Sequence, residues 1–231
     1  MAIINTGTLL LITFFGCTMG TLPPENKVQG YDLSRPDKTS TLPDTLREIS
    51  GLLSLDAQTV ACIQDENGIL FIYDLAKNEI KGQYTFGGDG DYEGIAKTTD
   101  AIFVMRSDAT LYEIRDYGSG KPKVATYSTQ APAEECEGLC YDRDHQRLLI
   151  GVKGKANKSK EDKDQRLVFG FDLTKKALMA DPVFNFSVEA MRRFAAANNI
   201  ELPIKTKKDG EQGKPVLKFK TSAMAVHPVT K

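Results

Sequence analysis

Histidine is scarce in this chain of 231 residues, which contains only His145 and His227. Both lie beside residues that are typical of turns, Asp144 and Gln146 around the first and Pro228 after the second, so we expect surface turns there. Two such histidines leave little material for a histidine-rich metal site or for a Ser-His-Asp triad. Chemistry at any site would therefore depend on other side chains.

An excess of positive charge is also missing. The chain has 30 Lys and Arg residues against 31 Asp and Glu residues, a formal net charge of −1. Proteins that bind nucleic acid usually present a basic face, so no nucleic-acid partner is expected. The basic run formed by Lys205, Lys207 and Lys208 is then best explained as a solvated loop.

Cysteine is present in four copies, of which Cys17 lies in the N-terminal segment discussed next. The remaining three, Cys62, Cys136 and Cys140, are an odd number, which argues against a complete disulfide framework. Cys136 and Cys140 lie four residues apart on a predicted strand, too far apart along one face to bond easily. Two thiols also make a weak zinc site. We expect all three to be small buried core residues.

No apolar run is long enough to cross a bilayer, which needs about 20 residues. The run 9–15 ends in Gly16-Cys17 and resembles the lipobox of bacterial lipoproteins, so we predict a signal segment at 1–17 with lipid on Cys17. A plain secretory signal or a buried strand stay open as alternatives, because no Lys or Arg precedes the run and Phe14 replaces the usual Leu. Residues 18–27 are predicted to be a tether. The expected location is the bacterial cell envelope, on the periplasmic or cell-surface side, with the membrane as partner through the lipid anchor.

What the sequence does contain is a repeated motif, in which an acidic or polar residue precedes glycine. The three clear copies are Glu48-Ile49-Ser50-Gly51-Leu52, Asp91-Tyr92-Glu93-Gly94-Ile95-Ala96 and Glu135-Cys136-Glu137-Gly138-Leu139-Cys140. Their glycines are 43 and 44 residues apart. A weaker fourth copy at 221–225 has Ala223 in the glycine position. A period of this length is typical of β-propeller blades.

Each repeat is predicted to form four short strands joined by turns. The predicted strands are 49–55, 59–64, 69–75 and 79–86 in the first repeat, 94–98, 101–106, 110–115 and 123–128 in the second, and 138–141, 147–153, 167–173 and 182–188 in the third. Glu66-Asn67-Gly68 is predicted to be a hairpin turn, because Asn-Gly tolerates positive φ. The predicted fold is therefore all-β, a propeller of four-stranded antiparallel blades over residues 28–231.

Two inserts interrupt this pattern. We expect a charged loop at 154–165 and an insert at 188–215, which would begin with an amphipathic helix at 188–199 and continue as a lysine-rich loop. Residues 216–226 would then restart a blade. The edge of that incomplete blade would be unpaired, and so would the strand near Tyr31. We therefore expect an N-terminal fragment of about three and a half blades, lacking about two and a half blades of a six-bladed ring.

Blade topology places the start of strand one beside the end of strand two, at one mouth of the central channel. That mouth would collect Glu48, Asp65, Asp91, Glu93, Arg106, Glu135, Glu137 and Lys153, with both inserts at the same end. Carboxylates suit Ca²⁺, which takes roughly six to eight oxygen ligands, and Glu93 and Glu137 are the candidate Ca²⁺ ligands. Binding of a cationic or polar ligand, a structural role in locking blades, and metal-activated hydrolysis stay open. No nucleophile–base pair is visible, so no catalytic residue is assigned.

The three motif copies, together with Asp65-Glu66-Asn67-Gly68 and residues 148–155, resemble the SdiA-regulated domain family. The resemblance covers residues 28–231. It implies a secreted or membrane-attached bacterial protein with a propeller similar to a six-bladed ring and a link to calcium. Wider propeller relatives include calcium-dependent phosphatases and lactonases, a likeness of fold that says little about function.

By position, Glu93 and Glu137 match the acid-glycine motif of that family, whereas Ser50 and Ser222 replace the acid in the first and fourth copies. A fully carboxylate ring is therefore not expected. The sequence favours a non-enzymatic cell-envelope propeller that binds Ca²⁺ or a small polar ligand at the channel mouth. The alternatives are a calcium-dependent hydrolase of phosphoesters or esters and a purely structural interaction scaffold.

Overall fold

A computed structural model describes residues 34–133, 135–154, 164–206, 210–217 and 219–227. The predicted signal segment with Cys17, the tether, the strand near Tyr31 and most of the loop 154–165 lie outside these residues. Residues 40–231 form one compact unit, which contains every strand and helix named below. No helix in the described part of the chain is long and apolar enough to cross a bilayer.

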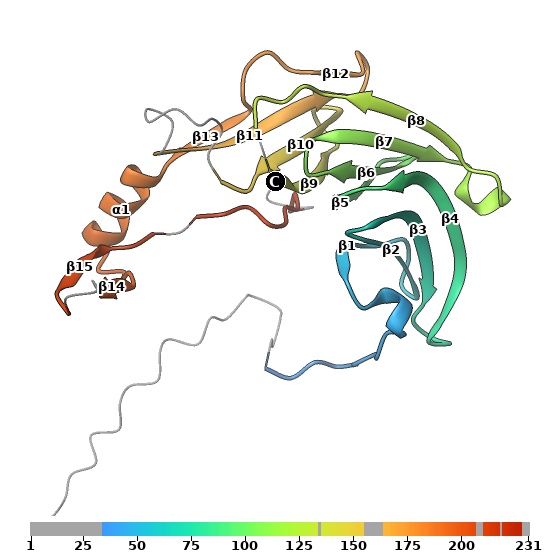
Figure 1. Ribbon diagram of the computed structural model, residues 1–231, viewed down its shortest axis with the longest axis horizontal. Coiled ribbons are helices and arrows are strands. Elements are labelled where there is room, and N and C mark those ends of the chain that lie inside the picture. Colours follow the sequence, from blue (N-terminus) through green and yellow to red (C-terminus); the bar gives the residue numbers. More distant parts are fainter. Residues whose placement is uncertain (1–33, 134, 155–163, 207–209, 218, 228–231) are drawn as a thin grey trace, which may run out of the picture. The chain divides into compact units, whose positions relative to one another are not determined.

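Three antiparallel sheets follow one another along the chain, each built from successive strands (Figure 1). After the 3-10 turn η1 (Asp44–Leu46), the first sheet contains β1 (Ile49–Ser54), β2 (Thr59–Gln64), β3 (Asn67–Asp74) and β4 (Glu79–Asp89). The second contains β5 (Tyr92–Lys97), β6 (Ile102–Arg106), β7 (Thr110–Arg115) and β8 (Lys123–Ser128), with η2 (Tyr117–Ser119) before β8. The third contains β9 (Cys136–Asp142), β10 (Arg147–Val152), β11 (Gln165–Asp172) and two short strands that both pair with β11, β12 (Ala177–Leu178) and β13 (Phe184–Ser187).

This topology confirms the predicted all-β fold of four-stranded antiparallel propeller blades. The strands of the first two sheets are hydrogen-bonded in chain order, and the third sheet follows the order β9, β10, β11, β12. The first strands of consecutive sheets contact one another, β1 with β5 and β5 with β9. Innermost strands lie side by side in this way in a propeller. The number of blades in an intact ring stays a prediction.

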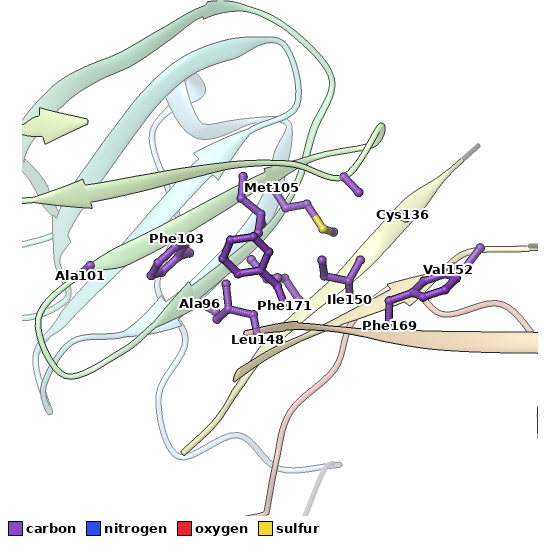
Figure 2. Packing of buried hydrophobic residues seen from close by; sticks show 13 residues of the cluster. Ala96, Ala101, Phe103, Met105, Cys136, Leu148, Ile150, Val152, Phe169 and Phe171 are labelled. Carbon is purple, nitrogen blue, oxygen red and sulfur yellow. The ribbon is translucent and has the colours of Figure 1, made fainter. Parts of the chain in front are cut away.

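The hydrophobic cores lie between consecutive blades. Figure 2 shows the cluster between the second and third blades, which contains Ala96, Ala101, Phe103, Met105, Leu148, Ile150, Phe169 and Phe171. A second cluster joins the first and second blades through Ile63, Leu70, Ile95, Ile102 and Val104. The second sheet thus buries one face against the first blade and the other against the third, and the first sheet buries its other face against Leu46 of η1. Burial of both faces explains the nearly continuous apolar runs of strands β2 and β6.

The three cysteines in the described residues are free and buried, as predicted. Burial raises the pKa of Cys62 and Cys140 to about 11, and that of Cys136 to about 12. These thiols are therefore protonated at neutral pH and pack as small apolar side chains. The two histidines, His145 and His227, are exposed, which also agrees with the prediction.

The motif glycines set the spacing between blades. A Cβ on Gly51 would lie 2.9 Å from Cγ2 of Ile95, and a Cβ on Gly94 would lie 2.7 Å from Cβ of Leu139. Ile95 and Leu139 each follow the next motif glycine along the chain. The space beside each motif glycine, called the socket below, therefore holds the side chain that follows the glycine of the next copy. This contact between blades explains why glycine recurs at this position.

We expect Gly94→Ala to lower the free energy of unfolding by about 1–3 kcal/mol. The new methyl group would meet the Cβ of Leu139, which cannot rotate away, so the backbones of β5 and β9 must separate. Gly118 lies in open space on the surface, and Gly118→Ala is the matched control with a change of less than about 0.5 kcal/mol. Denaturant unfolding measures both variants, and equal losses would contradict the socket.

Close packing also requires glycine at position 68, where the sequence predicts a turn. Only Asp65 and Glu66 separate β2 from β3, so Asn67 and Gly68 already belong to β3. A Cβ on Gly68 would lie 2.5 Å from the backbone of Gly87 in β4. The close approach of β4, rather than a hairpin turn, therefore requires this glycine.

Helix α1 (Val188–Ala197) begins the predicted insert 188–215, and its extent agrees with the predicted helix. Ser187 caps it, because its Oγ accepts a hydrogen bond from the Ala190 amide at 3.0 Å. The carboxylate of Asp164 accepts bonds from the Ser187 hydroxyl at 2.5 Å and from the Glu189 amide at 2.7 Å. The helix start is thus fixed to the beginning of β11.

The chain after α1 differs from the prediction in two places. The expected lysine-rich loop at 200–215 contains a hairpin, in which β14 (Ile204–Thr206) pairs with β15 (Gln212–Pro215). The strand expected at 216–226 is wrong, because residues 216–217 and 219–227 are irregular. The amide of Val216 donates to the Pro203 carbonyl at 2.8 Å instead of to a sheet, and within the described residues no strand pairs with this segment.

The same segment nevertheless packs on the third blade at the place that the repeat predicts. A Cβ on Gly138 would lie 2.7 Å from Cγ2 of Thr221 and 2.8 Å from Cγ of Met224. Met224 follows Ala223, the residue in the fourth glycine position, and so occupies the same socket position as Ile95 and Leu139. The fourth copy therefore packs against the third blade as the other copies pack against their neighbours, although it does not form a strand.

Candidate functional site

A β-bulge interrupts the pairing of strands one and two in each of the three blades. The register shifts between Ile49 and Gly51, between Tyr92 and Gly94, and between the partners of Gly151 and Val152, which are Gly138 and Cys136. The extra residue is the one before the motif glycine: Ser50, Glu93 and Glu137. Bulges often redirect a side chain at the rim of a sheet or beside a functional site.

Backbone hydrogen bonds connect these bulges to the ends of strand two. The Tyr92 amide donates to the Asp65 carbonyl at 2.7 Å, and the Cys136 amide donates to the Ser107 carbonyl at 2.8 Å. Both bonds join one blade to the next. Within a blade, the Ser107 amide donates to the Asp91 carbonyl at 2.8 Å. Blade-to-blade locking at this end is therefore carried by the main chain, which leaves the bulge side chains available for other roles.

Glu93 is the most perturbed acid at this end of the blades. Burial raises its pKa to about 7, and the nearby carboxylates of Glu137 and Asp91 add to the rise, while the Lys153 ammonium opposes it. The three carboxylates and the lysine therefore interact across two neighbouring blades. At pH 7 the carboxyl of Glu93 is only about half ionised.

Lys153 is the cation that balances this cluster. It follows β10 and forms an ion pair with Glu137 and a longer one with Glu135, whose Oε2 lies 3.9 Å from Nζ. The bond with Glu137 raises the pKa of Lys153, and the charges of Glu135 and Glu93 contribute further. One ammonium group thus faces at least three carboxylates, so the cluster formed by Asp91, Glu93, Glu135, Glu137 and Lys153, called the acidic mouth below, carries excess negative charge.

The other predicted site residues are placed differently. Arg106 forms an ion pair with Asp108 at 3.6 Å, and a hydrogen bond with Tyr112 raises the pKa of its guanidinium. The partners of Arg106 therefore come from its own blade. Glu48 is exposed. Asp65 is half-buried, and its Oδ1 is a buried atom without a hydrogen-bond partner among the described residues; the same holds for Oγ of Ser50.

The described residues do not form a complete metal site. In the part of the chain that is described, no group of three or more His, Cys, Asp or Glu side chains is close enough together to hold a metal ion. Glu93 and Glu137 supply two carboxylates, fewer than the roughly six oxygens that Ca²⁺ takes, so water or a ligand would have to supply the others. Ca²⁺ binding stays a prediction.

Sequence reasoning missed two features. The first is the β-bulge, in which Ser50, Glu93 and Glu137 occupy equivalent positions in the three blades. The second is a buried ionic group around Glu113 of β7, which binds Lys176 from the turn between β11 and β12. Its signal was available, because an acidic residue stands between apolar ones in a short strand that was expected to be buried.

Comparison with known proteins finds similarity only among solved structures. No family model matches the chain, and no curated protein matches it. Among solved structures, a chain of a mitotic checkpoint complex is 16% identical over 59% of this chain and 36% of its own length, with a TM-score of 0.42. A protein of unknown function from Bacteroides thetaiotaomicron is 12% identical over 57% of this chain and 30% of its own, with a TM-score of 0.41. The glutaminyl cyclase of Myxococcus xanthus is 13% identical over 79% and 64%, with a TM-score of 0.47. The chain spans less than two thirds of the length of each of them.

Proposed function

We propose that this chain is a non-enzymatic ligand-binding propeller of the cell envelope, which holds Ca²⁺ or a small polar cation at the acidic mouth. The observation that carries the proposal is the environment of Glu93. Its half-buried carboxyl faces Glu137 and Asp91, while the nearby ammonium of Lys153 is already paired with Glu137 and Glu135. A bound cation would relieve the repulsion among these carboxylates.

The chemistry of the mouth favours a hard or hydrogen-bonding cation over a soft metal. Its anionic groups are carboxylates, which suit Ca²⁺, and among the described residues the thiols are buried and the imidazoles are exposed outside the mouth. The bulge positions of Glu93 and Glu137 hold both side chains on adjacent inner strands. Their main chain is fixed by the bonds between blades, so the two carboxylates are pre-organised.

Calorimetric titration with Ca²⁺ tests this proposal. We expect binding by the wild-type protein at pH 8 and an affinity lower by at least about tenfold in Glu93→Gln, which removes one charge without changing the shape of the side chain. The matched control is Glu79→Gln, because Glu79 is an exposed acid paired with Lys77 on the outer strand of the first blade. Absence of Ca²⁺ binding by the wild type, or an equal loss in both variants, would contradict the site. Ca²⁺-dependent turnover of a phosphoester panel would contradict the non-enzymatic part.

The location in the cell envelope is part of the same proposal. It is supported by the apolar run 9–15 and the Gly16-Cys17 pair, which suit a lipid-anchored protein. The link to the SdiA-regulated domain family is likewise a proposal, and it is supported by the three motif copies at one period. Incorporation of a labelled fatty acid at Cys17 in bacterial cells tests the anchor independently of the ligand.

A further inference from the structure

A cavity of about 510 Å³ opens on the face of the third blade that does not pack against the second blade. Cys140, Leu149 and Val168, one residue from each of β9, β10 and β11, form its floor. The aromatic rings of β13 form one side, and residues 219–225 form a second wall. Figure 1 shows this last segment, in red, running back from β15 toward β9.

The third blade differs from the first two in the pairing of its motif glycine, next to this cavity. In the first two blades the residue opposite the motif glycine is large, Ile63 opposite Gly51 and Met105 opposite Gly94. In the third blade the residue opposite Gly138 is another glycine, Gly151. Two facing glycines leave a trough. Thr221 and Met224 fill this trough, since a Cβ on Gly151 would lie 2.5 Å and 2.8 Å from their side chains. Both residues also line the cavity, which opens beside the two glycines.

The apolar side of the cavity consists of aromatic rings that remain accessible. Phe184 is 45% exposed and Phe186 37% exposed. Their rings are stacked with centroids 6.0 Å apart, and the ring of Phe219 lies 5.9 Å from that of Phe186. Each ring leaves apolar surface in water, so a ligand that covers them gains the free energy of burying that surface.

The wall formed by 219–225 adds polar and positively charged residues to this apolar lining. It contributes Lys220, Thr221 and Ser222, and no Asp or Glu is among the described residues that line the cavity. Arg166 of β11 holds this wall in place, because its Nε donates to the Phe219 carbonyl at 2.9 Å. The cavity thus combines an apolar floor and side with hydrogen-bond donors and a cation on one rim.

We propose that this cavity binds a small amphipathic carboxylate, with its aromatic or acyl part against Phe184, Phe186 and Phe219 and its carboxylate at Lys220. The volume lies within the roughly 300–1,000 Å³ of small-molecule sites, which are mostly apolar with a few polar groups that fix orientation. The positive rim selects an anion over a cation of the same chain length. This site is separate from the acidic mouth, and neither proposal depends on the other.

Calorimetry with decanoate, below its micelle concentration, tests the site, and decylamine is the probe of equal chain length and opposite charge. We expect decanoate to bind and decylamine to bind at least about fivefold more weakly. Lys220→Gln should weaken decanoate binding by about threefold to fivefold, as for a partly exposed ion pair. Lys121→Gln, at an exposed lysine before β8, is the matched control and should change nothing.

A second variant keeps the test independent of the charge. Ala223 is exposed and lines the cavity, so Ala223→Trp should fill it and abolish decanoate binding while circular dichroism stays that of the wild type. Equal affinity for decanoate and decylamine, or full binding by Ala223→Trp, would overturn the proposal. So would a wild-type dimer that Ala223→Trp dissociates and that binds no decanoate, because this face would then be the contact with a second copy of the chain.

Discussion

Lys176→Met should lower the free energy of unfolding by about 2–4 kcal/mol at neutral pH. The substitution keeps an apolar side chain of similar length but removes the ammonium that faces Glu113, a carboxylate only 4% exposed. Nζ of Lys176 lies 2.8 Å from Oε2 of Glu113, and it also lies 5.3 Å and 5.4 Å from the ring centroids of Phe103 and Tyr127. The variant leaves a buried carboxylate with one cation fewer.

The size of this effect follows from what remains around Glu113. Arg115 still donates to Oε1 and the Tyr127 hydroxyl to Oε2, so the carboxylate is not left bare and the loss stays below that of an unpaired buried charge. Burial by itself would raise the pKa of Glu113, but the bonds from Lys176, Tyr127 and Arg115 outweigh it and lower that pKa. The lowered pKa stabilises the fold above the ordinary pKa of glutamate, and this stability is lost as pH falls through the folded-state pKa. The cost of Lys176→Met should therefore shrink in acid.

Chemical denaturation at pH 7 and below pH 4 measures this difference. Lys175→Met is the matched control, because Lys175 is 79% exposed and its ion pair with Asp172 spans 3.8 Å, so a change of less than about 0.5 kcal/mol is expected. Adding Glu113→Gln to Lys176→Met should recover part of the loss, since the buried negative charge that Lys176 no longer balances is then gone. Similar losses in Lys175→Met and Lys176→Met would show that Glu113 does not depend on Lys176.

The blade architecture could be predicted because its causes are local. Predicted strands of four to eight residues with turn residues between them, repeated at the spacing of Gly51, Gly94 and Gly138, leave few other folds. The packing role of Met224 could also be anticipated from its place after Ala223 in the fourth copy. Glycine at a fixed position implied a close contact, and the structure identifies the contact as the next blade.

Other features depend on pairings that no local pattern reveals. The bulge at Glu93 looks like one more residue of a strand, because a bulge is defined by its partner, here Arg106 and Met105 of β6. The bond between Glu113 and Lys176 joins residues 63 positions apart. Residues 216–217 and 219–226 are irregular rather than a strand. Val216 bonds instead to Pro203, beside a hairpin that the sequence pattern does not predict.

Glu93→Gln should stabilise the fold at pH 8 by about 2 kcal/mol while leaving it unchanged near pH 4.5. The carboxyl of Glu93 has its pKa raised from 4.5 to about 7, first by burial and then by the charges of Glu137 and Asp91. Between these two pH values the folded protein holds a proton that the unfolded chain has released. The free energy of unfolding therefore falls as pH rises from about 4.5 to about 7, and it stays low above that.

Glutamine at position 93 carries no charge at any pH, so this part of the pH dependence should vanish in the variant. The full shift corresponds to about 3 kcal/mol, and partial exposure of the side chain reduces it to about 2 kcal/mol. Denaturant unfolding at half-unit steps from pH 4.5 to 8 measures the difference. Glu79→Gln should run parallel to the wild type, because its exposed carboxylate lies at the start of the outer strand β4 and pairs only with Lys77 among the described contacts.

The Glu93→Gln variant also tests whether Ca²⁺ binding changes the stability of the fold. Millimolar Ca²⁺ at pH 8 should restore the stability of the wild type toward that of Glu93→Gln, because a cation bound at the acidic mouth removes the repulsion that the substitution also removes. It should add little to the variant, whose site has lost a ligand. A wild-type curve that is flat between pH 4.5 and 8 would contradict the strained carboxyl at Glu93. A sloping curve that Ca²⁺ leaves unchanged would confirm the repulsion at Glu93 but contradict the Ca²⁺ site, because a cation bound among these carboxylates must relieve their repulsion and so raise the stability of the wild type.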